Sequence, residues 1–261
     1  MTIFAEELNT TSLSKATLVF LPGGGLSGWS WRPVAEQLLE YRSLLVDLPE
    51  HGRSASVGPF TMRLAADEVK KLIEERAGGR AHVIGLSLGA QVAVQILATT
   101  PEIIQTAFLS SCSLRPIPGV GNHILLTLIF GLYRPFQNIP WLVRANARQF
   151  GVPETYQANF ADDTRSLSPT KLARVVSASQ NFRLQLGMKG INMPIIVMVG
   201  EKELATIKRS AKDLTEALPN ARAYEVIGQN HAWTISNPRL CASVIKAFLN
   251  GSPVPSSLQL I

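Results

Sequence analysis

The sequence has little of what marks several protein classes. It holds only two cysteines, Cys112 and Cys241, which cannot form a disulfide framework, so nothing in it requires an oxidising compartment. Its longest apolar run, 124–133, is interrupted by Thr127 and Gly131 and is about half of the roughly 20 residues that a membrane-crossing helix needs. Charged residues make up 17% of the chain and apolar residues 46%. This balance excludes wholesale disorder and allows a large buried core.

The formal net charge of +6 does not point to a nucleic-acid partner. The basic residues are scattered with few aromatic residues between them, and the densest run, Lys208 to Lys212, stands beside Asp213 and Glu216 at helical spacing. Residues 1–15 carry acidic rather than basic side chains early, unlike a signal peptide. We therefore expect a cytoplasmic protein that acts on a small molecule, with no nucleic acid and no membrane span, as a monomer or a dimer.

Short apolar runs alternate with helical patterns along most of the 261 residues. Each run ends at turn-forming residues, which is typical of strands buried on both faces. The expected strands are 17–21, 43–46, 81–84, 106–109, 194–199 and 223–227, and the expected helices are 33–39, 62–76, 89–99, 207–218 and 239–249. The alternation predicts an α/β fold with a mainly parallel, doubly wound sheet. The Pro- and Ser-rich tail, 251–261, is expected to be frayed.

The alternation is interrupted once, between residues 115 and 189. This stretch shows helical patterns and prolines but no clear strand, and it is too long for a plain loop. We predict a helical insertion, or lid, over residues 115–189 and a core domain formed by residues 1–114 and 190–261. The first half of the insertion is apolar, and its side chains either pack the insertion onto the core or line a ligand pocket. The apolar residues are Leu125, Leu126, Leu128, Ile129, Phe130, Leu132, Phe136, Trp141, Leu142 and Val143.

A Gly-x-Ser-x-Gly motif occupies residues 85–89, between an expected strand and an expected helix. The pentapeptide alone is a weak signal, but a sharp strand-turn-helix corner strains the serine backbone and projects its hydroxyl at the rim of the sheet. Glycines are needed on both sides because side chains there would clash in the tight turn. Ser87 is therefore the candidate nucleophile, the alternative being a serine that only caps the helix.

A serine hydroxyl needs a base to take its proton, and the chain has four histidines. His51 lies in a turn after a strand, His82 begins an apolar strand, and His123 lies early in the insertion. His231 lies between the last expected strand and the last expected helix, at the same carboxyl edge of the sheet as Ser87. His231 is therefore the candidate base.

The base needs a carboxylate to orient it, and two loops could supply one. The loop after strand 106–109 is excluded, because no Asp or Glu occurs from residue 103 to residue 153. The loop after strand 194–199 carries Glu201 and Glu203. Glu203 is favoured because it lies further from the strand end, where the loop can turn inward.

An acyl-transfer site also needs hydrogen-bond donors for the oxyanion. The corner at the serine leaves the backbone N–H of Leu88 free, and a second donor is expected from the glycine-rich loop 22–29. Consecutive glycines let a backbone approach a ligand closely. A nucleotide loop is not favoured there, because neither Lys-Ser/Thr nor Gly-x-Gly-x-x-Gly spacing is present.

Taken together, these motifs resemble those of the α/β-hydrolase superfamily over residues 15–250. The resemblance rests on the segments 21–25, 47–54, 85–89, 200–203 and 230–233. It implies Ser87 as nucleophile, Glu203 as acid, His231 as base, and the backbone N–H groups of Gly24 and Leu88 as the oxyanion hole. The sequence departs from the family in having Pro22 where His is usual, Glu203 where Asp is usual, and Glu50 where Gly is common.

The function expected is hydrolysis of a small to medium apolar carboxylic ester through an acyl-enzyme, without metal or cofactor. Two alternatives stay open. The same triad could act on a lactone, a thioester or a C–C bond of a carboxylate-bearing substrate, if one of Arg115, Arg134, Arg144 and Arg148 points inward. The other alternative is a ligand receptor that kept the fold without turnover. No substrate-binding residue is assigned.

Overall fold

A single eight-stranded sheet forms the centre of the molecule, in the order β1-β3-β2-β4-β5-β6-β7-β8. The computed structural model describes residues 2–11, 16–116, 123–185 and 187–261. The inner strands run parallel, and β1 and β8 pair antiparallel at the two edges. The strands are β1 (Ala5–Leu8), β2 (Thr17–Leu21), β3 (Arg42–Val46), β4 (Ala81–Leu86), β5 (Ile104–Ser110), β6 (Ile195–Gly200), β7 (Ala221–Val226) and β8 (Leu258–Leu260).

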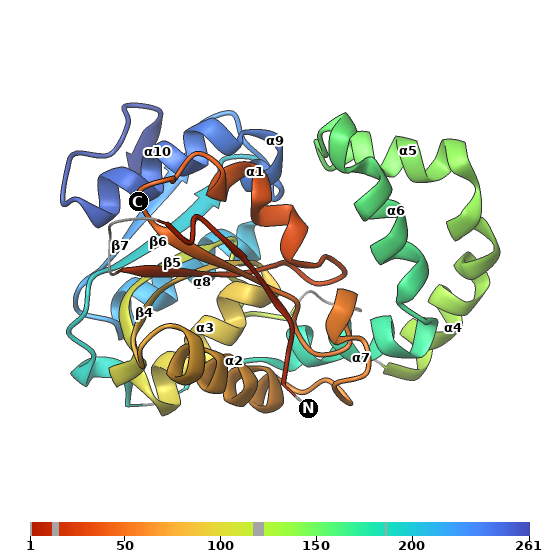
Figure 1. Cartoon of the computed structure of the whole chain (residues 1–261), viewed down its shortest axis with the longest axis horizontal. Helices are drawn as coiled ribbons and strands as arrows, with labels where there is room; N and C mark the ends of the chain where they lie inside the picture. The colour runs from red at the N-terminus through yellow and green to blue at the C-terminus, as the bar shows by residue number, and fades with distance from the viewer. Residues whose placement is uncertain (1, 12–15, 117–122, 186) are drawn as a thin grey trace.

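Helices cover both faces of the sheet, as Figure 1 shows. One face is covered by α2, α3 and α8, and the other by α1, α9 and α10. Alternate residues of a strand serve the two cores: in β2, Val19 and Leu21 pack toward one and Leu18 and Phe20 toward the other. The helices are α1 (Arg32–Ala35), α2 (Met62–Arg76), α3 (Leu88–Thr99), α8 (Ala205–Ala217), α9 (Trp233–Ser236) and α10 (Pro238–Leu249). The predicted doubly wound α/β fold is confirmed.

The sequence pattern did not indicate the two edge strands. All six expected strands are present with slightly different ends, whereas β1 and β8 were not expected. The frayed-tail prediction for 251–261 is wrong, because β8 pairs with β7 through Leu258, Gln259 and Leu260. An edge strand is bonded on one side only and needs no continuous apolar run, so the pattern that reveals buried strands does not reveal it.

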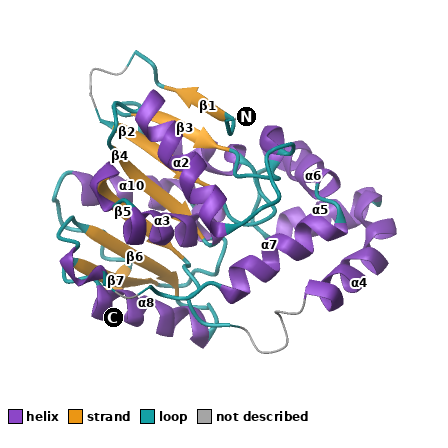
Figure 2. Ribbon diagram, turned by 90° about the horizontal axis from the view of Figure 1, so that it is seen from below, coloured by secondary structure: helices purple, strands orange, loops and turns teal. Residues whose placement is uncertain are grey.

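Between β5 and β6 the described residues contain helices and no strand. The helices are α4 (His123–Tyr133), α5 (Pro140–Gln149), α6 (Gln157–Ser166) and α7 (Pro169–Asn181). Figures 1 and 2 place them together at one side of the sheet. We call residues 123–181 the helical segment; the boundaries 115 and 189 and the role of a lid stay predictions. Residues 117–122 and 186 of the predicted insertion lie outside the described residues.

The ten apolar side chains predicted for the first half of the insertion differ in burial, and two of them, Phe130 and Leu142, are half-buried. Leu126 and Val143 are buried, so part of the set packs the segment together and onto its surroundings. The exposed members are Leu125, Leu128, Ile129, Leu132, Phe136 and Trp141. Within the described ranges, no helix combines the length and the apolarity that crossing a bilayer requires.

Candidate active site

Ser87 occupies a sharp corner between β4 and α3. Its backbone has φ 51° and ψ −108°, a conformation that costs free energy for a residue with a side chain. Both neighbouring glycines are sterically required. A Cβ at Gly85 would lie 2.6 Å from the backbone of Gly89, and a Cβ at Gly89 would lie 2.2 Å from the carbonyl oxygen of Leu21. The corner leaves Ser87 half-buried at the start of α3.

The end of β5 provides the surface on which the site is assembled. Ser87 donates its backbone N–H to the carbonyl oxygen of Ser110 at 2.8 Å. The Ser110 hydroxyl accepts a 2.9 Å hydrogen bond from the indole N–H of Trp233, which begins α9. The next residue, Ser111, has a positive φ of 56° and donates its hydroxyl to Glu203 at 2.6 Å. Two adjacent serines therefore contact both the nucleophile corner and the candidate acid.

Glu203 and His231 form a direct pair, with Oε2 of the carboxylate 2.8 Å from Nδ1 of the imidazole. The Glu203 side chain is fully buried, whereas the His231 side chain is 43% exposed. Oε1 of Glu203 accepts from the Ser111 hydroxyl and from the backbone N–H of Gly200 at 2.8 Å. Because the ionised carboxylate only accepts, the hydrogen on the imidazole lies on Nδ1, and Nε2 is left to accept a proton.

The two acidic residues of this loop make different contacts. Glu201 is exposed and accepts the backbone N–H of Gly228 at 2.7 Å, whereas Glu203 contacts His231. The two loops also meet closely, since a Cβ at Gly200 would lie 2.7 Å from the carbonyl oxygen of Asn230. The preference for Glu203 as the residue that orients the histidine therefore agrees with the geometry, while its catalytic role stays a prediction.

Ser87 and His231 share the rim of the sheet without being hydrogen-bonded to each other among the described residues. Ser87 contacts Ser110, and the carbonyl oxygen of His231 accepts from the Ser111 hydroxyl at 3.4 Å. The two candidate residues are thus held on consecutive residues of the β5 terminus. Hydrogen bonds of a catalytic site are often long without substrate and tighten when it binds.

The loop after β2 lies beside the start of α3. A Cβ at Gly24 would lie 3.7 Å from Cβ of Leu88, so these two candidate oxyanion donors are close neighbours. Leu88 is the first residue of α3, where backbone N–H groups have no partner within the helix. Gly24 is therefore a neighbour of Leu88, the residue after Ser87, while the role of the two as oxyanion donors stays a prediction.

His51 is a functional candidate that the sequence did not reveal. Its Nδ1 lies 2.9 Å from the carbonyl oxygen of Pro49, and its Nε2 accepts the backbone N–H of Gly25 at 3.1 Å. Burial lowers the pKa of His51, so the neutral form that can accept at Nε2 is favoured. From the sequence, the motif 47–54 indicates only a turn. That this turn supports the glycine-rich loop is visible only once the two segments are packed together in the fold.

The other histidines lie outside this arrangement. His82 bonds Thr106 at 2.8 Å through Nδ1, a local contact on the sheet. His123 is half-buried at the start of α4. Across the described ranges, no cluster of three or more His, Cys, Asp or Glu side chains has the arrangement of metal ligands.

The four arginines considered as possible anchors for a substrate carboxylate are all exposed. Arg115 forms a bidentate pair with Asp213 on α8, with both contacts at 2.7 Å. Arg134, Arg144 and Arg148 are exposed on and around α4 and α5. The structure therefore places none of the four as an inward anchor for a substrate carboxylate.

A cavity of about 430 Å³ opens beside the Glu203–His231 pair. Its apolar wall comes from two different parts of the chain, Phe150 after α5 and Leu204 and Ile207 at the start of α8. Its remaining lining residues are Gln149, Lys202, Asn230 and Ala232. The cavity is of a size that accepts a small molecule.

Known proteins resemble this chain over almost its whole length. The profile of the Alpha/beta hydrolase family matches residues 18–244. Pimeloyl-[acyl-carrier protein] methyl ester esterase from Edwardsiella ictaluri is 27% identical, with 94% of this chain and 98% of that protein covered. Among solved structures, the enol-lactonase from Burkholderia xenovorans LB400 superposes with a TM-score of 0.76 at 20% identity, covering 95% of this chain and 96% of that one. MenH from S. aureus gives a TM-score of 0.75 at 20% identity, with coverages of 96% and 99%.

The matched range begins in β2 and ends in α10, so it contains the Ser87 corner, both glutamate positions and His231. The fold, the sequence profile and the relatives agree with the resemblance drawn from the motifs. The chain belongs to the alpha/beta hydrolase family.

Proposed function

We propose that this protein is a serine hydrolase that cleaves a small to medium apolar carboxylic ester through an acyl-enzyme. The observation that carries the proposal is the buried Glu203 carboxylate 2.8 Å from His231 Nδ1, at the rim where the strained Ser87 corner projects. The ester-cleaving relative at 27% identity supports the same reaction class. A small-molecule partner, the absence of a nucleic-acid partner and a cytoplasmic location remain predictions.

The mechanism follows from the protonation state of His231. Nε2 takes the Ser87 proton as Oγ attacks the carbonyl carbon, and the Glu203 carboxylate stabilises the imidazolium that forms. The negative charge that develops on the carbonyl oxygen rests on the backbone N–H groups of Gly24 and Leu88. His231 then gives the proton to the leaving alcohol, and the acyl group stays on Ser87.

Water then hydrolyses the acyl-enzyme, with His231 again acting first as base and then as acid. His231 removes a proton from a water molecule that attacks the acyl-enzyme carbonyl, and the proton passes to Ser87 Oγ as the ester bond to the enzyme breaks. The products are a carboxylic acid and the free enzyme. The apolar wall of Phe150, Leu204 and Ile207 lies in the cavity that His231 lines, and it favours a substrate with an apolar group on that side of the histidine.

The test is a substrate panel with a matched nucleophile variant. The wild-type protein should hydrolyse short-chain nitrophenyl esters and should be labelled by a fluorophosphonate probe at Ser87. Ser87→Ala should lose both while keeping its circular dichroism spectrum and melting temperature. Equal turnover by the two proteins contradicts the proposal, and a folded wild-type protein that no probe labels favours a ligand receptor.

The panel also separates the alternative bonds. Lactones, thioesters and anionic esters are included beside neutral esters of increasing acyl length. We expect neutral esters to be preferred, because Arg115 pairs with Asp213 and the other three arginines are exposed. A strong preference for carboxylate-bearing substrates would contradict that expectation and favour the second reaction class.

A further inference from the structure

The glycine-rich loop 22–29 is held by acceptors from distant parts of the chain. Gly25 donates its backbone N–H to Nε2 of His51 at 3.1 Å, and Gly28 donates to Oδ1 of Asp47 at 2.7 Å. Both acceptors lie on the segment after β3. This side of the loop is therefore fixed by the sheet domain itself.

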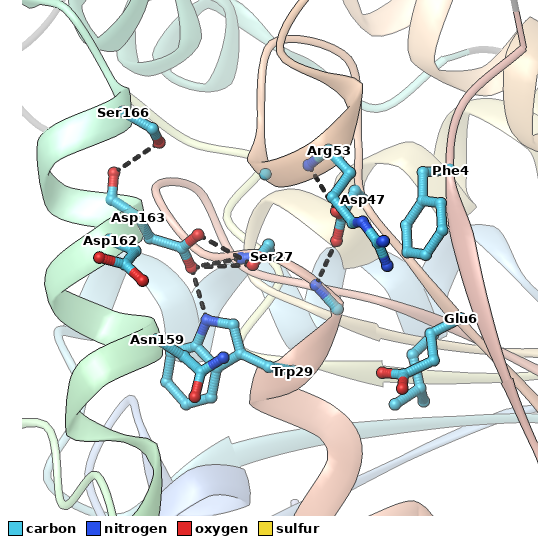
Figure 3. Close-up of a pocket in the computed structure, with 13 residues that line it drawn as sticks. Phe4, Glu6, Ser27, Trp29, Asp47, Arg53, Asn159, Asp162, Asp163 and Ser166 are labelled. Atoms are coloured by element: carbon cyan, nitrogen blue, oxygen red, sulfur yellow. Dashed lines mark hydrogen bonds between the residues drawn. The ribbon is translucent and has the colours of Figure 1, made fainter.

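The third support comes from the helical segment. Asp163 on α6 accepts the backbone N–H of Ser27 at 2.8 Å, its hydroxyl at 2.8 Å and the indole N–H of Trp29 at 2.6 Å. Figure 3 shows the carboxylate of Asp163 pointing toward Ser27 and Trp29. Asp163 lies 136 positions after Ser27 and 134 positions after Trp29, so these contacts join two separate parts of the fold.

Asp163 makes these contacts as a buried carboxylate. It is 6% exposed, and no Lys, Arg or His of the described residues forms an ion pair with it. The charged groups that line the same cavity, of about 340 Å³, are Glu6, Asp47, Arg53 and Asp162. Burial of an unpaired carboxylate is costly, so the three donors are what makes the position tolerable.

Within the part of the chain that the structure describes, the supports leave the backbone N–H groups of Gly23 and Gly24 free for another acceptor. Leu26 donates within the loop to the carbonyl oxygen of Gly23 at 3.1 Å. The N–H groups of Gly23 and Gly24 have no acceptor among the described residues. The backbone N–H of Gly24, which lies beside Leu88, is thus available to a ligand, while the residues after it are held by hydrogen bonds.

We propose that Asp163 is a positioning residue, which holds the loop 22–29 from α6 so that the N–H of Gly24 faces the carbonyl bound at Ser87. The inference rests on the proposed function and makes the seating of the helical segment a condition for oxyanion stabilisation. A run of three glycines has little conformational preference of its own, so its geometry depends on its anchors. An oxyanion donor acts only when it lies about 2.7–3.1 Å from the charge.

The experiment compares three variants on one nitrophenyl ester. Asp163→Ala removes all three contacts and should lower kcat by tenfold or more, with KM changed less than about twofold, since a loosened donor affects the transition state most. Asp163→Asn should keep kcat within about threefold of wild type, because its amide oxygen accepts from Ser27 N–H and Trp29 while its NH₂ donates to the Ser27 hydroxyl. Asp162→Ala is the matched control on the same helix and should change neither constant, because its side chain is 76% exposed.

A transition-state analogue distinguishes positioning from general damage. A trifluoromethyl ketone forms an oxyanion on Ser87, so its affinity for Asp163→Ala should fall by the same factor as kcat/KM. The affinity for the carboxylic acid product should stay unchanged. Where the alanine variant fails to fold, Trp29→Phe removes one donor and keeps a ring beside Tyr156, with which Trp29 stacks at 5.8 Å, and should show the same parallel loss.

The outcomes separate the two proposals. Wild-type kcat in the folded alanine variant, or a lower kcat with unchanged analogue affinity, overturns the positioning role while Ser87 still turns over esters. A wild-type protein that hydrolyses no acyl substrate and takes no fluorophosphonate label overturns the proposed function and the positioning role together.

Discussion

Replacing Asp163 by Asn should make the protein clearly more stable at pH 8 and change its stability by less than about 1 kcal/mol at pH 4. Burial is the main cause that raises the pKa of Asp163 from 3.8 to about 6, and the hydrogen bonds from Trp29 and Ser27 oppose it. At pH 8 the folded protein therefore holds an ionised carboxylate in a place that favours the neutral acid.

The sign follows from proton binding. Between pH 3.8 and about 6 the folded protein keeps a proton on Asp163 that the unfolded chain has already lost, so the free energy of unfolding falls as the pH rises through this window. The two values lie about two pH units apart, and at 1.36 kcal/mol for each the loss is about 3 kcal/mol. The loss of stability is complete above the pKa of Asp163 in the folded protein, about 6, and absent well below its pKa in the unfolded chain, 3.8.

Asn has nearly the shape of the protonated acid and does not titrate. The Asp163→Asn variant should therefore exceed the wild type by up to about 3 kcal/mol at pH 8 and by less than about 1 kcal/mol at pH 4. Urea unfolding followed by tryptophan fluorescence at pH 4, 5, 6, 7 and 8 measures the difference, and Asp162→Asn is the control. A difference that is absent at pH 8, or equal at all five pH values, would refute the reasoning.

Three further substitutions test other parts of the site and its frame. Glu203→Gln removes the charge that stabilises the His231 imidazolium and should lower kcat by about 10²- to 10⁴-fold with little change in melting temperature; a loss below threefold in steady-state assays would contradict the triad. Gly89→Ala places a Cβ 2.2 Å from the carbonyl oxygen of Leu21 and should cost about 3 kcal/mol or more in urea unfolding, so an unchanged midpoint would show the corner to be adaptable. Arg115→Ala breaks an exposed ion pair and should cost less than about 1 kcal/mol in the same assay; a larger loss would assign it a structural role.

The sequence predicted what depends on local pattern. The runs that became β2 to β7 are mostly apolar because both faces of the sheet are covered, and such runs are visible in the sequence. The Ser87 corner was also predictable. The turn leaves no room for a side chain on either side of the serine, and this requirement is visible within the five-residue motif itself. Glu203 could be chosen over Glu201 because loop length decides how far a side chain can turn inward.

The sequence did not predict what depends on packing between distant segments. Ser111, which donates to the Glu203 oxygen that does not contact His231, stands in no motif, and its role follows from the register of β5 against β6. No motif or spacing in the sequence gives Asp163 a role. Its partners lie more than 130 residues earlier, so no periodicity or spacing connects them.

The edge strands have a consequence for how the chain is handled. β8 occupies the free hydrogen-bonding side of β7, and after it Ile261 donates its backbone N–H to the carbonyl oxygen of Ala223 at 3.0 Å. Removing residues 258–261 would expose the backbone N–H and C=O groups along this side of β7. A strand of another molecule could then pair with them. Expression trials should therefore retain Leu258 to Ile261, and a shortened version should elute from a sizing column as a mixture of self-associated species.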